Sequence, residues 1–280
     1  MPISLQQALR DSISLRNVSE SSALDTELLL SYVTGKSREY LRTHSEESLS
    51  IETYDKFQYL MLRRKQGEPI AYILGNKEFW DFDLKVNKSV LIPRPETEFL
   101  VEQTLAKLKN KFAPLRIADL GTGSGAIAIA IARKNSGWQI DAVDISEDAL
   151  LVARENAAML QVSNIEFHLG SWCDGLPKEQ YDLIVANPPY VAPEQKLFLG
   201  EGLSFEPSVA LVAEDLGFAA LDTIIRTAKF YLKKDAWLLM EHGHDQQKKL
   251  VDSLKDLGYK NVAGHKDYAG IDRIVECKWI

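Results

Sequence analysis

Residues 115–133 read LRIADLGTGSGAIAIAIAR, and this stretch decides the fold class. The apolar run Leu115–Leu120 is typical of a buried strand, and residues 126–133 form an apolar segment long enough to continue as a helix. Between them lies the turn Gly121–Gly125, whose three glycines permit a sharp change of direction and close approach of a ligand to the backbone. A strand, a glycine-rich turn and a helix form the opening of a nucleotide-binding βαβ unit.

The spacing of the glycines limits which nucleotides this turn can hold. The third glycine comes one residue earlier than in the dinucleotide pattern G-x-G-x-x-G, and the G-K-S/T of phosphate loops is absent. Hydrolysis of ATP or GTP is therefore disfavoured. A second expected strand (residues 139–143) ends at Asp144, about 20 residues beyond the turn, where an acid hydrogen-bonds ribose hydroxyls in such folds. The plainer alternative for the glycines is a strand-to-helix turn without a ligand.

A third apolar run, Tyr181–Ala186, predicts a buried strand that ends at Asn187, Pro188, Pro189 and Tyr190. Ligands of open α/β sheets sit beyond the carboxyl ends of strands, so this tetrapeptide is expected to line a site. Because prolines carry no backbone N–H, the carbonyls of Asn187 and Pro188 are rigid acceptors without donors beside them. The Asn187 side chain adds a carbonyl and Tyr190 adds a flat face, which together suit a planar –NH2 group of an amide or a base. The alternative is a proline-rich turn without function.

The rest of the sequence predicts a helical N-terminal region followed by an α/β domain. Apolar residues at helical spacing, with Ser and Thr at cap positions, predict four or five short helices in roughly the first 65 residues. After a break at Gly67, partial alternation from Ile73 to Leu91 indicates a β-hairpin linker. Beyond it, strands alternate with helices, which implies a mostly parallel sheet, and a closing strand pair suggests one antiparallel strand. Besides those above, the expected elements are helices at 96–109, 147–160, 217–232 and 246–257, and strands at 165–169, 237–241, 261–265 and 271–277.

Taken together, these motifs resemble a known family. The pattern of Asp119 with the glycine turn, the acid at Asp144 and the Asn-Pro-Pro-Tyr tetrapeptide is similar to that of S-adenosylmethionine-dependent amino-group methyltransferases. More closely, the chain resembles the release-factor glutamine methyltransferases (the PrmC, or HemK, family). The stretches that carry this closer resemblance are GEPIAYILG at 67–75, LIPRPETE at 91–98, EPSVAL at 206–211 and DYAGIDR at 267–273.

The resemblance implies both an architecture and an activity. The fold is expected to be α/β, with a Rossmann-like S-adenosylmethionine-dependent methyltransferase sheet that is mostly parallel and has one antiparallel strand at its end. Residues 1–72 are expected to form an N-terminal helical substrate-binding domain, 73–95 a β-hairpin linker, and 96–280 the catalytic domain. The implied reaction moves a methyl group from S-adenosyl-L-methionine to the side-chain amide nitrogen of the glutamine in the Gly-Gly-Gln loop of peptide chain release factors, and leaves S-adenosyl-L-homocysteine.

Other activities stay open at this point. DNA or RNA adenine N6-methyltransferases also carry Asn-Pro-Pro-Tyr, with base flipping supplying the amine. A ribosomal-protein glutamine methyltransferase is a further alternative, because sister enzymes share the tetrapeptide. A cofactor-binding protein without catalysis is the remaining one.

The expected catalytic residues are Asn187, Pro188 and Tyr190. We expect Asn187 Oδ1 and the Pro188 carbonyl to accept the two N–H bonds of a glutamine side chain, which aligns its nitrogen with the methyl group. Pro189 and Tyr190 are expected to contact the same substrate, with Tyr190 as a wall beside the amide plane. Nothing near the motif is an obvious base, and none is required, because the alkylated nitrogen is acidic enough to lose its proton to water.

The cofactor is expected to lie against the glycine turn. Asp144 is assigned to the ribose hydroxyls, Trp172 either to stacking on the adenine or to the core, and Asp119 either to the cofactor ammonium or to bracing the loop. The full set of expected cofactor-binding residues is Asp119, Gly121, Thr122, Gly123, Ser124, Gly125, Asp144, Trp172 and Asn187.

Two further segments carry candidate residues. Arg94, Glu96 and Thr97 either form a wall of the substrate cleft, with Arg94 and Glu96 as substrate-binding residues, or pin the linker to the catalytic domain. The segment from Glu241 to His244 (EHGH) invites a metal site, but two histidines without a third well-placed ligand favour a surface loop. No bound metal is therefore expected.

The composition of the chain limits which partners the protein can have. Hydrophobic residues make up 45% of the 280 residues and charged residues 26%, which is ordinary for a soluble globular protein. The formal charge of −7 argues against direct contact with nucleic acid, whose binders carry clustered Lys and Arg. No stretch is long and apolar enough for a bilayer, no secretory signal opens the chain, and Cys173 and Cys277 lack a C-x-x-C spacing. We therefore expect a cytoplasmic protein with no membrane contact. A monomer is also expected, although the composition does not fix the oligomeric state.

Overall fold

The computed structural model describes residues 3–109, 113–194 and 201–280, and these form two compact units. The first unit ends at Asn76 and includes the short 3-10 turn η4 (Glu201–Phe205). The second begins at Lys77 and holds the remaining described residues. In the described residues no helix is long and apolar enough to cross a membrane.

The first unit is helical, as predicted. Serines begin three of its helices, since the side chains of Ser4, Ser37 and Ser50 each accept a hydrogen bond from a backbone N–H in the first turn. Apolar side chains from all five helices, including Leu29 and Phe57, form its buried core. Its elements are α1 (Leu5–Arg10), η1 (Asp11–Leu15), α2 (Ser22–Thr34), α3 (Arg38–Thr43), α4 (Ile51–Lys65) and α5 (Ile70–Leu74).

Helix α5 corrects the sequence interpretation, which began the hairpin at Ile73. Pro69 precedes the helix, and Gly75 ends it in the left-handed conformation (φ +77°) that favours glycine. The predicted hairpin is present but shorter, with strands β1 (Asn76–Phe79) and β2 (Phe82–Lys85). A short helix closed by Pro and Gly gives too few turns for a visible period, which explains the error.

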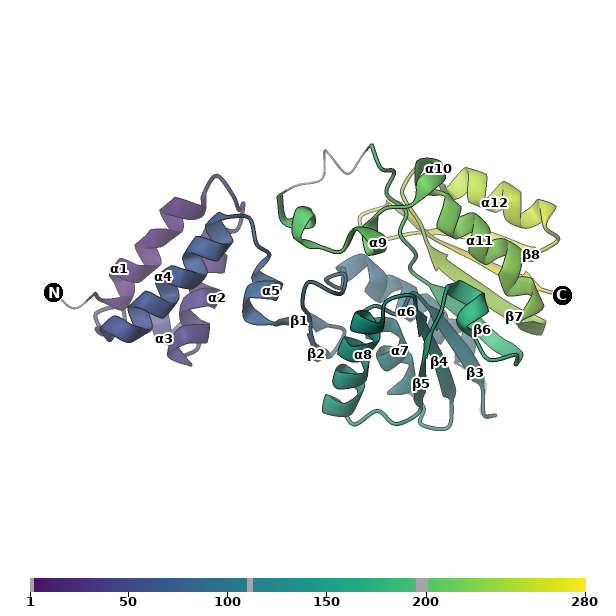
Figure 1. The fold of residues 1–280 in the computed structure, drawn as a ribbon, viewed down its shortest axis with the longest axis horizontal. Coiled ribbons are helices and arrows are strands. Elements are labelled where there is room, and N and C mark those ends of the chain that lie inside the picture. Colours follow the sequence, from purple (N-terminus) through teal and green to yellow (C-terminus); the bar gives the residue numbers. More distant parts are fainter. Residues whose placement is uncertain (1–2, 110–112, 195–200) are drawn as a thin grey trace. The chain divides into compact units, whose positions relative to one another are not determined.

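The second unit contains a seven-stranded sheet in the order β5-β4-β3-β6-β7-β9-β8 (Figure 1). Neighbours from β5 to β7 are parallel, and β9 is antiparallel to both β7 and β8. This confirms the predicted mostly parallel sheet with one antiparallel strand. The strands are β3 (Arg116–Leu120), β4 (Gln139–Asp144), β5 (Ile165–Leu169), β6 (Tyr181–Ala186), β7 (Leu232–Glu241), β8 (Lys260–Lys266) and β9 (Asp272–Trp279).

Helices cover both faces of this sheet, so the central strands are apolar on both sides. Helices α6 (Pro95–Leu108), α7 (Ala126–Ala132) and α8 (Glu147–Met159) contribute to one core, and α11 (Ala219–Thr227) and α12 (Gln247–Asp256) contribute to the other (Figure 1). The hairpin adds Phe79, Phe82 and Leu84 to the first of these cores. The division expected from sequence, at 72/73 and 95/96, stays a prediction. The remaining short elements are η2 (Trp172–Gly175), α9 (Ser208–Leu211), α10 (Glu214–Gly217) and η5 (Ala228–Phe230).

The predicted helix at 217–232 and strand at 237–241 need correction. Helix α11 begins two residues later than predicted because Gly217 has a positive φ angle, and it ends five residues earlier because the 3-10 turn η5 follows Thr227. Strand β7 begins earlier, at Leu232, which pairs with Tyr181 of β6. The other predicted elements of this unit are confirmed to within two residues at each end.

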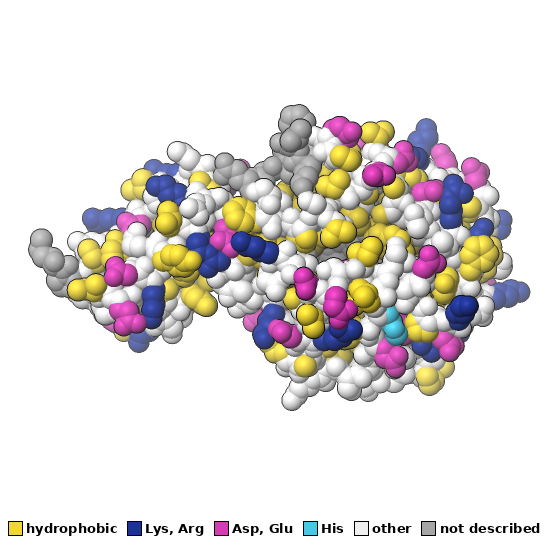
Figure 2. Space-filling model, viewed as in Figure 1, with side chains coloured by type: hydrophobic (Ala, Val, Ile, Leu, Met, Phe, Trp, Pro, Cys, Tyr) yellow, Lys and Arg dark blue, Asp and Glu magenta, His cyan; other side chains and the backbone are white. Residues whose placement is uncertain are grey.

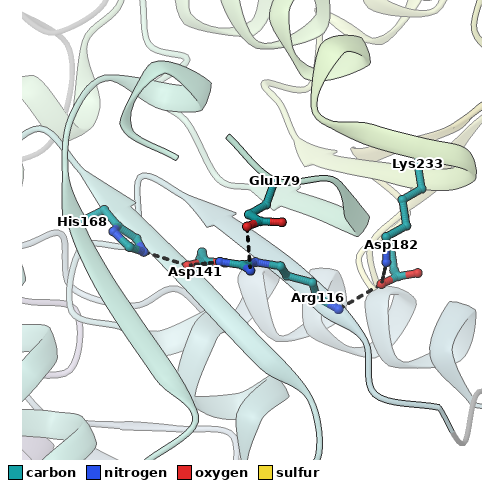
Figure 3. A network of polar contacts seen from close by, with 6 residues as sticks. All are labelled: Arg116, Asp141, His168, Glu179, Asp182 and Lys233. Atoms are coloured by element: carbon teal, nitrogen blue, oxygen red, sulfur yellow. Dashed lines mark hydrogen bonds and ion pairs between the residues drawn. The ribbon is translucent and has the colours of Figure 1, made fainter. Parts of the chain in front are cut away.

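A polar network joins five adjacent strands on one face of the sheet (Figure 3). Arg116 of β3 donates to Asp141 of β4 through Nε (2.7 Å) and to Asp182 of β6 through its backbone N–H (2.9 Å). His168 Nε2 of β5 lies 2.7 Å from Asp141, and Lys233 of β7 pairs with Asp182 at 2.7 Å. Because the Asp141 side chain is fully buried, water does not solvate it, and the hydrogen bonds and charges of these partners stabilise it instead.

Replacing Asp141 tests this network. Asp141→Ala leaves Arg116 and His168 without their carboxylate, so we expect the free energy of unfolding to fall by about 3 kcal/mol. Glu179→Ala is the matched control, because Glu179 is exposed and lies 3.8 Å from the same guanidinium; its effect should stay below about 1 kcal/mol. Urea unfolding measures the free energy of unfolding of both variants. Similar losses in the two would contradict a stabilising role of the buried Asp141–Arg116 pair.

Candidate active site

A cavity of about 390 Å³ lies at the carboxyl ends of the central parallel strands, within the second unit. This is where ligands of open α/β sheets bind. Six of the residues predicted from sequence line it: Gly121, Gly123, Asp144, Trp172, Asn187 and Pro189. Further lining residues come from three other segments: Ser89, Val90 and Leu91; Val209, Ala210, Val212, Ala213 and Glu214; and Ala219, Ala220 and Thr223.

The glycine turn is packed tightly against Trp172. Gly121 has φ +74°, and a Cβ at this position would lie 3.1 Å from the edge of the Trp172 ring. Trp172 itself has a positive φ (47°), a strained conformation that places its ring at the cavity wall. The turn and the ring therefore form one continuous surface of the cavity.

Asp144 ends β4 as predicted and presents its carboxylate to the cavity. Its two oxygens accept from the backbone N–H of Gly123 and of Ser146, each at 2.9 Å. Burial raises the pKa of Asp144, while these N–H donors lower it. Each carboxylate oxygen has a second lone pair, so the group keeps the capacity to accept from ligand hydroxyls.

Asp119 is fully buried beneath the turn and does not line the cavity. Its Oδ2 accepts from Thr122 Oγ1 (2.7 Å) and from the backbone N–H of Ala128 (3.2 Å), so the side chain braces the loop. No described residue donates to its Oδ1, and burial raises the pKa of Asp119 to about 7. Bracing was one of the two roles expected; contact with the cofactor stays a prediction.

The other predicted residues of the turn also lie behind the cavity wall. Ser124 is buried and its carbonyl accepts from Asn156 Nδ2 at 2.9 Å. Gly125 (φ +84°) lies at the start of α7 and packs against Ile129 of α7 and Ala153 of α8. These contacts, like that of Thr122 with Asp119, support the turn, and direct roles of Thr122, Ser124 and Gly125 in cofactor binding stay predictions.

The Asn-Pro-Pro-Tyr turn follows β6 at the cavity. Asn187 Nδ2 donates to Thr97 Oγ1 of α6 at 3.0 Å. Among the hydrogen bonds of the described residues, none reaches Asn187 Oδ1 or the carbonyl of Pro188. Pro188 is buried, whereas Asn187 and Pro189 are partly exposed and line the cavity. The turn thus holds acceptors without neighbouring donors, as its sequence implies.

Tyr190 is held at both of its polar ends. Its hydroxyl donates to Glu241 Oε1 at 3.1 Å, and its carbonyl accepts from Gln246 Nε2 at 3.1 Å. Burial, with Glu241 as the next cause, raises the pKa of the Tyr190 phenol, which therefore stays protonated at neutral pH. The backbone of Gly217 packs directly on the Tyr190 carbonyl, and this close approach requires a glycine.

Arg94 and Thr97 of the LIPRPETE stretch have different partners. Arg94 pairs with the buried Glu206 at 2.6 Å, and Glu206 also accepts from the backbone N–H of Ile92 at 3.1 Å. This pair ties the start of α6 to the EPSVAL stretch, which agrees with the pinning alternative for Arg94. Thr97 instead reaches Asn187, and Glu96 is partly exposed. Substrate contacts of Arg94 and Glu96 stay predictions.

The expected surface loop at Glu241–His244 is wrong for its first three residues. Glu241 is 1% exposed and His242 fully buried, because β7 is covered on both faces up to its end. Burial raises the pKa of Glu241 to about 7, and the hydrogen bonds from Thr97 and Tyr190 act in the opposite direction. His242 Nδ1 lies 2.8 Å from the Gly243 carbonyl, and burial lowers the pKa of His242.

The one group in the described chain with a metal-ligand arrangement lies elsewhere. It comprises Asp141, Glu166 and His168, of which Asp141 and His168 belong to the network of Figure 3. Both Asp141 oxygens are already engaged, by Arg116 and by His168, so the carboxylate is committed to an ion pair. That the protein binds no metal stays a prediction.

Sequence reasoning missed three residues that hold the site together: Gly217, Glu241 and Gln246. A signal for Glu241 was present, because the apolar run of β7 ends in an acid, as β4 ends in Asp144. Since β7 is the neighbour of β6, that acid lies beside the Asn-Pro-Pro-Tyr turn. The contacts of Gly217 and Gln246 join distant segments and leave no local pattern.

Comparison with known proteins agrees with this architecture. Two family models match, the PrmC N-terminal domain over residues 7–75 and the methyltransferase small domain over residues 95–203. A release factor glutamine methyltransferase of Shewanella oneidensis is 44% identical over 96% of this chain and 93% of its own length. One from Coxiella burnetii is 45% identical over 98% of both. A solved structure, the T. thermophilus 16S rRNA N2 G1207 methyltransferase (RsmC) in complex with AdoMet and guanosine, shares the fold, with a TM-score of 0.54 and 15% identity over 73% of this chain and 50% of that chain.

The sheet, the glycine turn and the cavity at its carboxyl edge define an S-adenosylmethionine-dependent methyltransferase. The similarity to the two bacterial relatives, which extends over nearly the full length of the chain, narrows this class to one family. The chain belongs to the release factor glutamine methyltransferase family, as its sequence motifs indicated.

Gly217→Ala tests the support of the Asn-Pro-Pro-Tyr turn. A Cβ at Gly217 would lie 2.1 Å from the Tyr190 carbonyl oxygen, so the turn must move. We expect a loss of about 3 kcal/mol in the free energy of unfolding, from the left-handed φ and the overlap together. Gly270→Ala is the control, with φ +79° and open space around it, and should lose about 1 kcal/mol. Equal losses in the free energy of unfolding of the two variants, measured in urea, would show that the contact of Gly217 with Tyr190 does not require a glycine.

Proposed function

We propose that this protein transfers a methyl group from S-adenosylmethionine to the side-chain amide nitrogen of the glutamine in the Gly-Gly-Gln loop of peptide chain release factors. The observation that carries the proposal is the acceptor rim of the Asn-Pro-Pro-Tyr turn: Asn187 lines the cavity, and no described residue donates a hydrogen bond to Asn187 Oδ1 or to the carbonyl of the next residue, Pro188. Such a rim matches the two N–H bonds of a carboxamide. The relatives named as release factor glutamine methyltransferases support the choice of acceptor.

The cavity fits S-adenosylmethionine. Asp144 offers a carboxylate to the ribose hydroxyls, and Gly121 and Gly123 allow close approach of the ligand. Trp172 gives a flat wall for the adenine. Asp119 Oδ1, buried and without a partner among the described residues, is an acceptor suited to the cofactor ammonium through a water. When bound, the cofactor supplies a sulfonium methyl group, which is electrophilic.

The residues of the chain align the substrate amide and stabilise the charge that develops on it. An amide nitrogen is a weak nucleophile because its lone pair is delocalised into the carbonyl. Acceptance of both N–H bonds by Asn187 and Pro188 fixes the amide plane, and the two oxygens disperse the positive charge that develops on the nitrogen. Tyr190, held through both its hydroxyl and its carbonyl, walls one side of this plane. The alkylated nitrogen then loses one proton to water, so no strong base is required.

The remaining assignments from sequence belong to the same proposal. The N-terminal helical unit (residues 1–72) and the linker (73–95) hold the release factor beside the catalytic domain (96–280). The protein works as a cytoplasmic monomer without direct contact with nucleic acid. On the face that Figure 2 shows, Lys and Arg side chains are interspersed with Asp and Glu, which supports this last point.

The acceptor is tested by offering radiolabelled S-adenosylmethionine to the protein with purified release factor, ribosomes or DNA in separate reactions. We expect label in the release factor, and mass spectrometry should place the added methyl group on the glutamine of Gly-Gly-Gln. Label in DNA alone would point to an adenine methyltransferase. Label in a ribosomal protein would keep the chemistry and change the acceptor.

Asn187→Ala tests the acceptor rim. Removal of Oδ1 leaves one amide N–H of the substrate unpaired, so we expect kcat to fall about 10²- to 10³-fold, as for other preorganised groups that act on the transition state. Affinity for S-adenosylhomocysteine should change little, because Asp144 and the glycine turn remain. Calorimetric titration checks the affinity and a label-transfer assay the rate. Full turnover in this variant would remove Asn187 from the mechanism.

A further inference from the structure

The Asn187 carboxamide has two orientations that differ only in whether Nδ2 or Oδ1 faces Thr97. Both fill nearly the same space, so shape alone does not choose between them. Only the orientation with Nδ2 toward Thr97 presents Oδ1 as an acceptor to a substrate amide. The other orientation would present an N–H donor to the N–H bonds of the substrate.

The Thr97 hydroxyl makes this choice, because it has a single hydrogen. Thr97 Oγ1 lies 2.9 Å from Glu241 Oε2 and 3.0 Å from Asn187 Nδ2. An ionised carboxylate has no hydrogen to give, so Thr97 must donate to Glu241 and can only accept from Asn187. The hydrogen bonds therefore run in one direction, from Asn187 through Thr97 to Glu241.

The carboxylate of Glu241 is fixed by donors on both oxygens. Thr97 occupies Oε2, and the Tyr190 hydroxyl donates to Oε1 at 3.1 Å. Glu241 is 1% exposed, so water does not replace a lost donor. If Asn187 turned over, Thr97 would donate to Asn187 and leave Oε2 of a buried carboxylate without a partner, which is unfavourable.

We infer that Glu241 and Thr97 are positioning residues for methyl transfer: the buried Glu241 carboxylate, acting through the Thr97 hydroxyl, holds the Asn187 carboxamide with Oδ1 toward the substrate. The inference rests on the proposed function, because an acceptor at Asn187 serves only a substrate that brings N–H groups. Both residues act through Asn187. The same carboxylate fixes the Tyr190 hydroxyl, so one buried charge orients both ends of the Asn-Pro-Pro-Tyr turn.

Protonation of Glu241 would break this order. A protonated carboxyl can donate to Thr97, whose own hydrogen is then released toward Asn187, and the carboxamide can turn over. The orienting form of Glu241 is therefore the ionised one. Turnover should fall as the pH drops below the pKa of this carboxyl.

The groups that face Glu241 set the pH of this change. Burial raises its pKa to about 7, with Glu96 of α6 acting in the same direction. The hydrogen bonds from Thr97 and Tyr190, and the charge of Arg273 of β9, lower it. The acid limb of kcat is thus expected near neutral pH, well above the range of an ordinary glutamate.

Two variants at Thr97 separate orientation from packing. Thr97→Val removes the hydroxyl at nearly constant volume, and Thr97→Ser keeps it. With full-length protein, saturating S-adenosylmethionine and purified release factor, we expect kcat to fall about 10-fold or more for Thr97→Val. Thr97→Ser should restore most of the turnover, and both should bind S-adenosylhomocysteine as the wild type does. Equal kcat values for the two variants would overturn the inference.

The pH profile of kcat tests Glu241 itself. Wild-type protein should show an acid limb of kcat near pH 7, and Glu241→Gln should have a lower kcat without the part of this limb that comes from Glu241. Burial also raises the pKa of Asp119 to about 7, so an acid limb caused by Asp119 would appear in both proteins, and the ratio of the wild-type kcat to the Glu241→Gln kcat removes it. We expect this ratio to fall as the pH drops below 7, and a ratio that stays level contradicts the inference. Wild-type protein that methylates no release factor at any pH would instead overturn the proposed function, and the inference with it.

Discussion

Two consecutive prolines after β6, Pro188 and Pro189, carry no backbone N–H, and the mechanism that we propose depends on this constraint. A donor at this place would compete with the substrate for the Pro188 carbonyl or repel the amide hydrogens. The prolines make the turn rigid, but residues from other segments fix its orientation. Gly217 and Gln246 fix the carbonyl of Tyr190, and Thr97 fixes the carboxamide of Asn187.

The sheet brings these supports together from distant parts of the chain. Thr97 and Glu241 are 144 residues apart, yet they meet because α6 packs near the carboxyl end of β7, the neighbour of β6. Two of the strands end in a carboxylate at this same edge of the sheet: β4 in Asp144 and β7 in Glu241. The first serves the cofactor side of the cavity in our account, and the second orients the acceptor side.

Much of this architecture could be predicted from local sequence. Strands β3, β4 and β6 are short apolar runs ended by Gly, Asp or Asn, and both the sheet and the position of the turn follow from them. Predictions were wrong where an element was too short to show a periodic pattern, or where tertiary packing determined the structure. Helix α5 has only five residues between Pro69 and Gly75, and the helix predicted at 217–232 extended through the 3-10 turn η5 to the first residue of β7. Glu241 and His242 resemble a polar loop, because sequence alone does not show that the end of β7 is covered.

The most direct measurement is a crystal structure of the protein bound to S-adenosylhomocysteine and a Gly-Gly-Gln peptide. We expect the glutamine amide nitrogen to lie within hydrogen-bond distance of both Asn187 Oδ1 and the Pro188 carbonyl. Asn187 Nδ2 should remain on Thr97 in that complex. A glutamine bound away from these two oxygens, or a turn directed away from the bound cofactor product, would contradict the proposed mechanism.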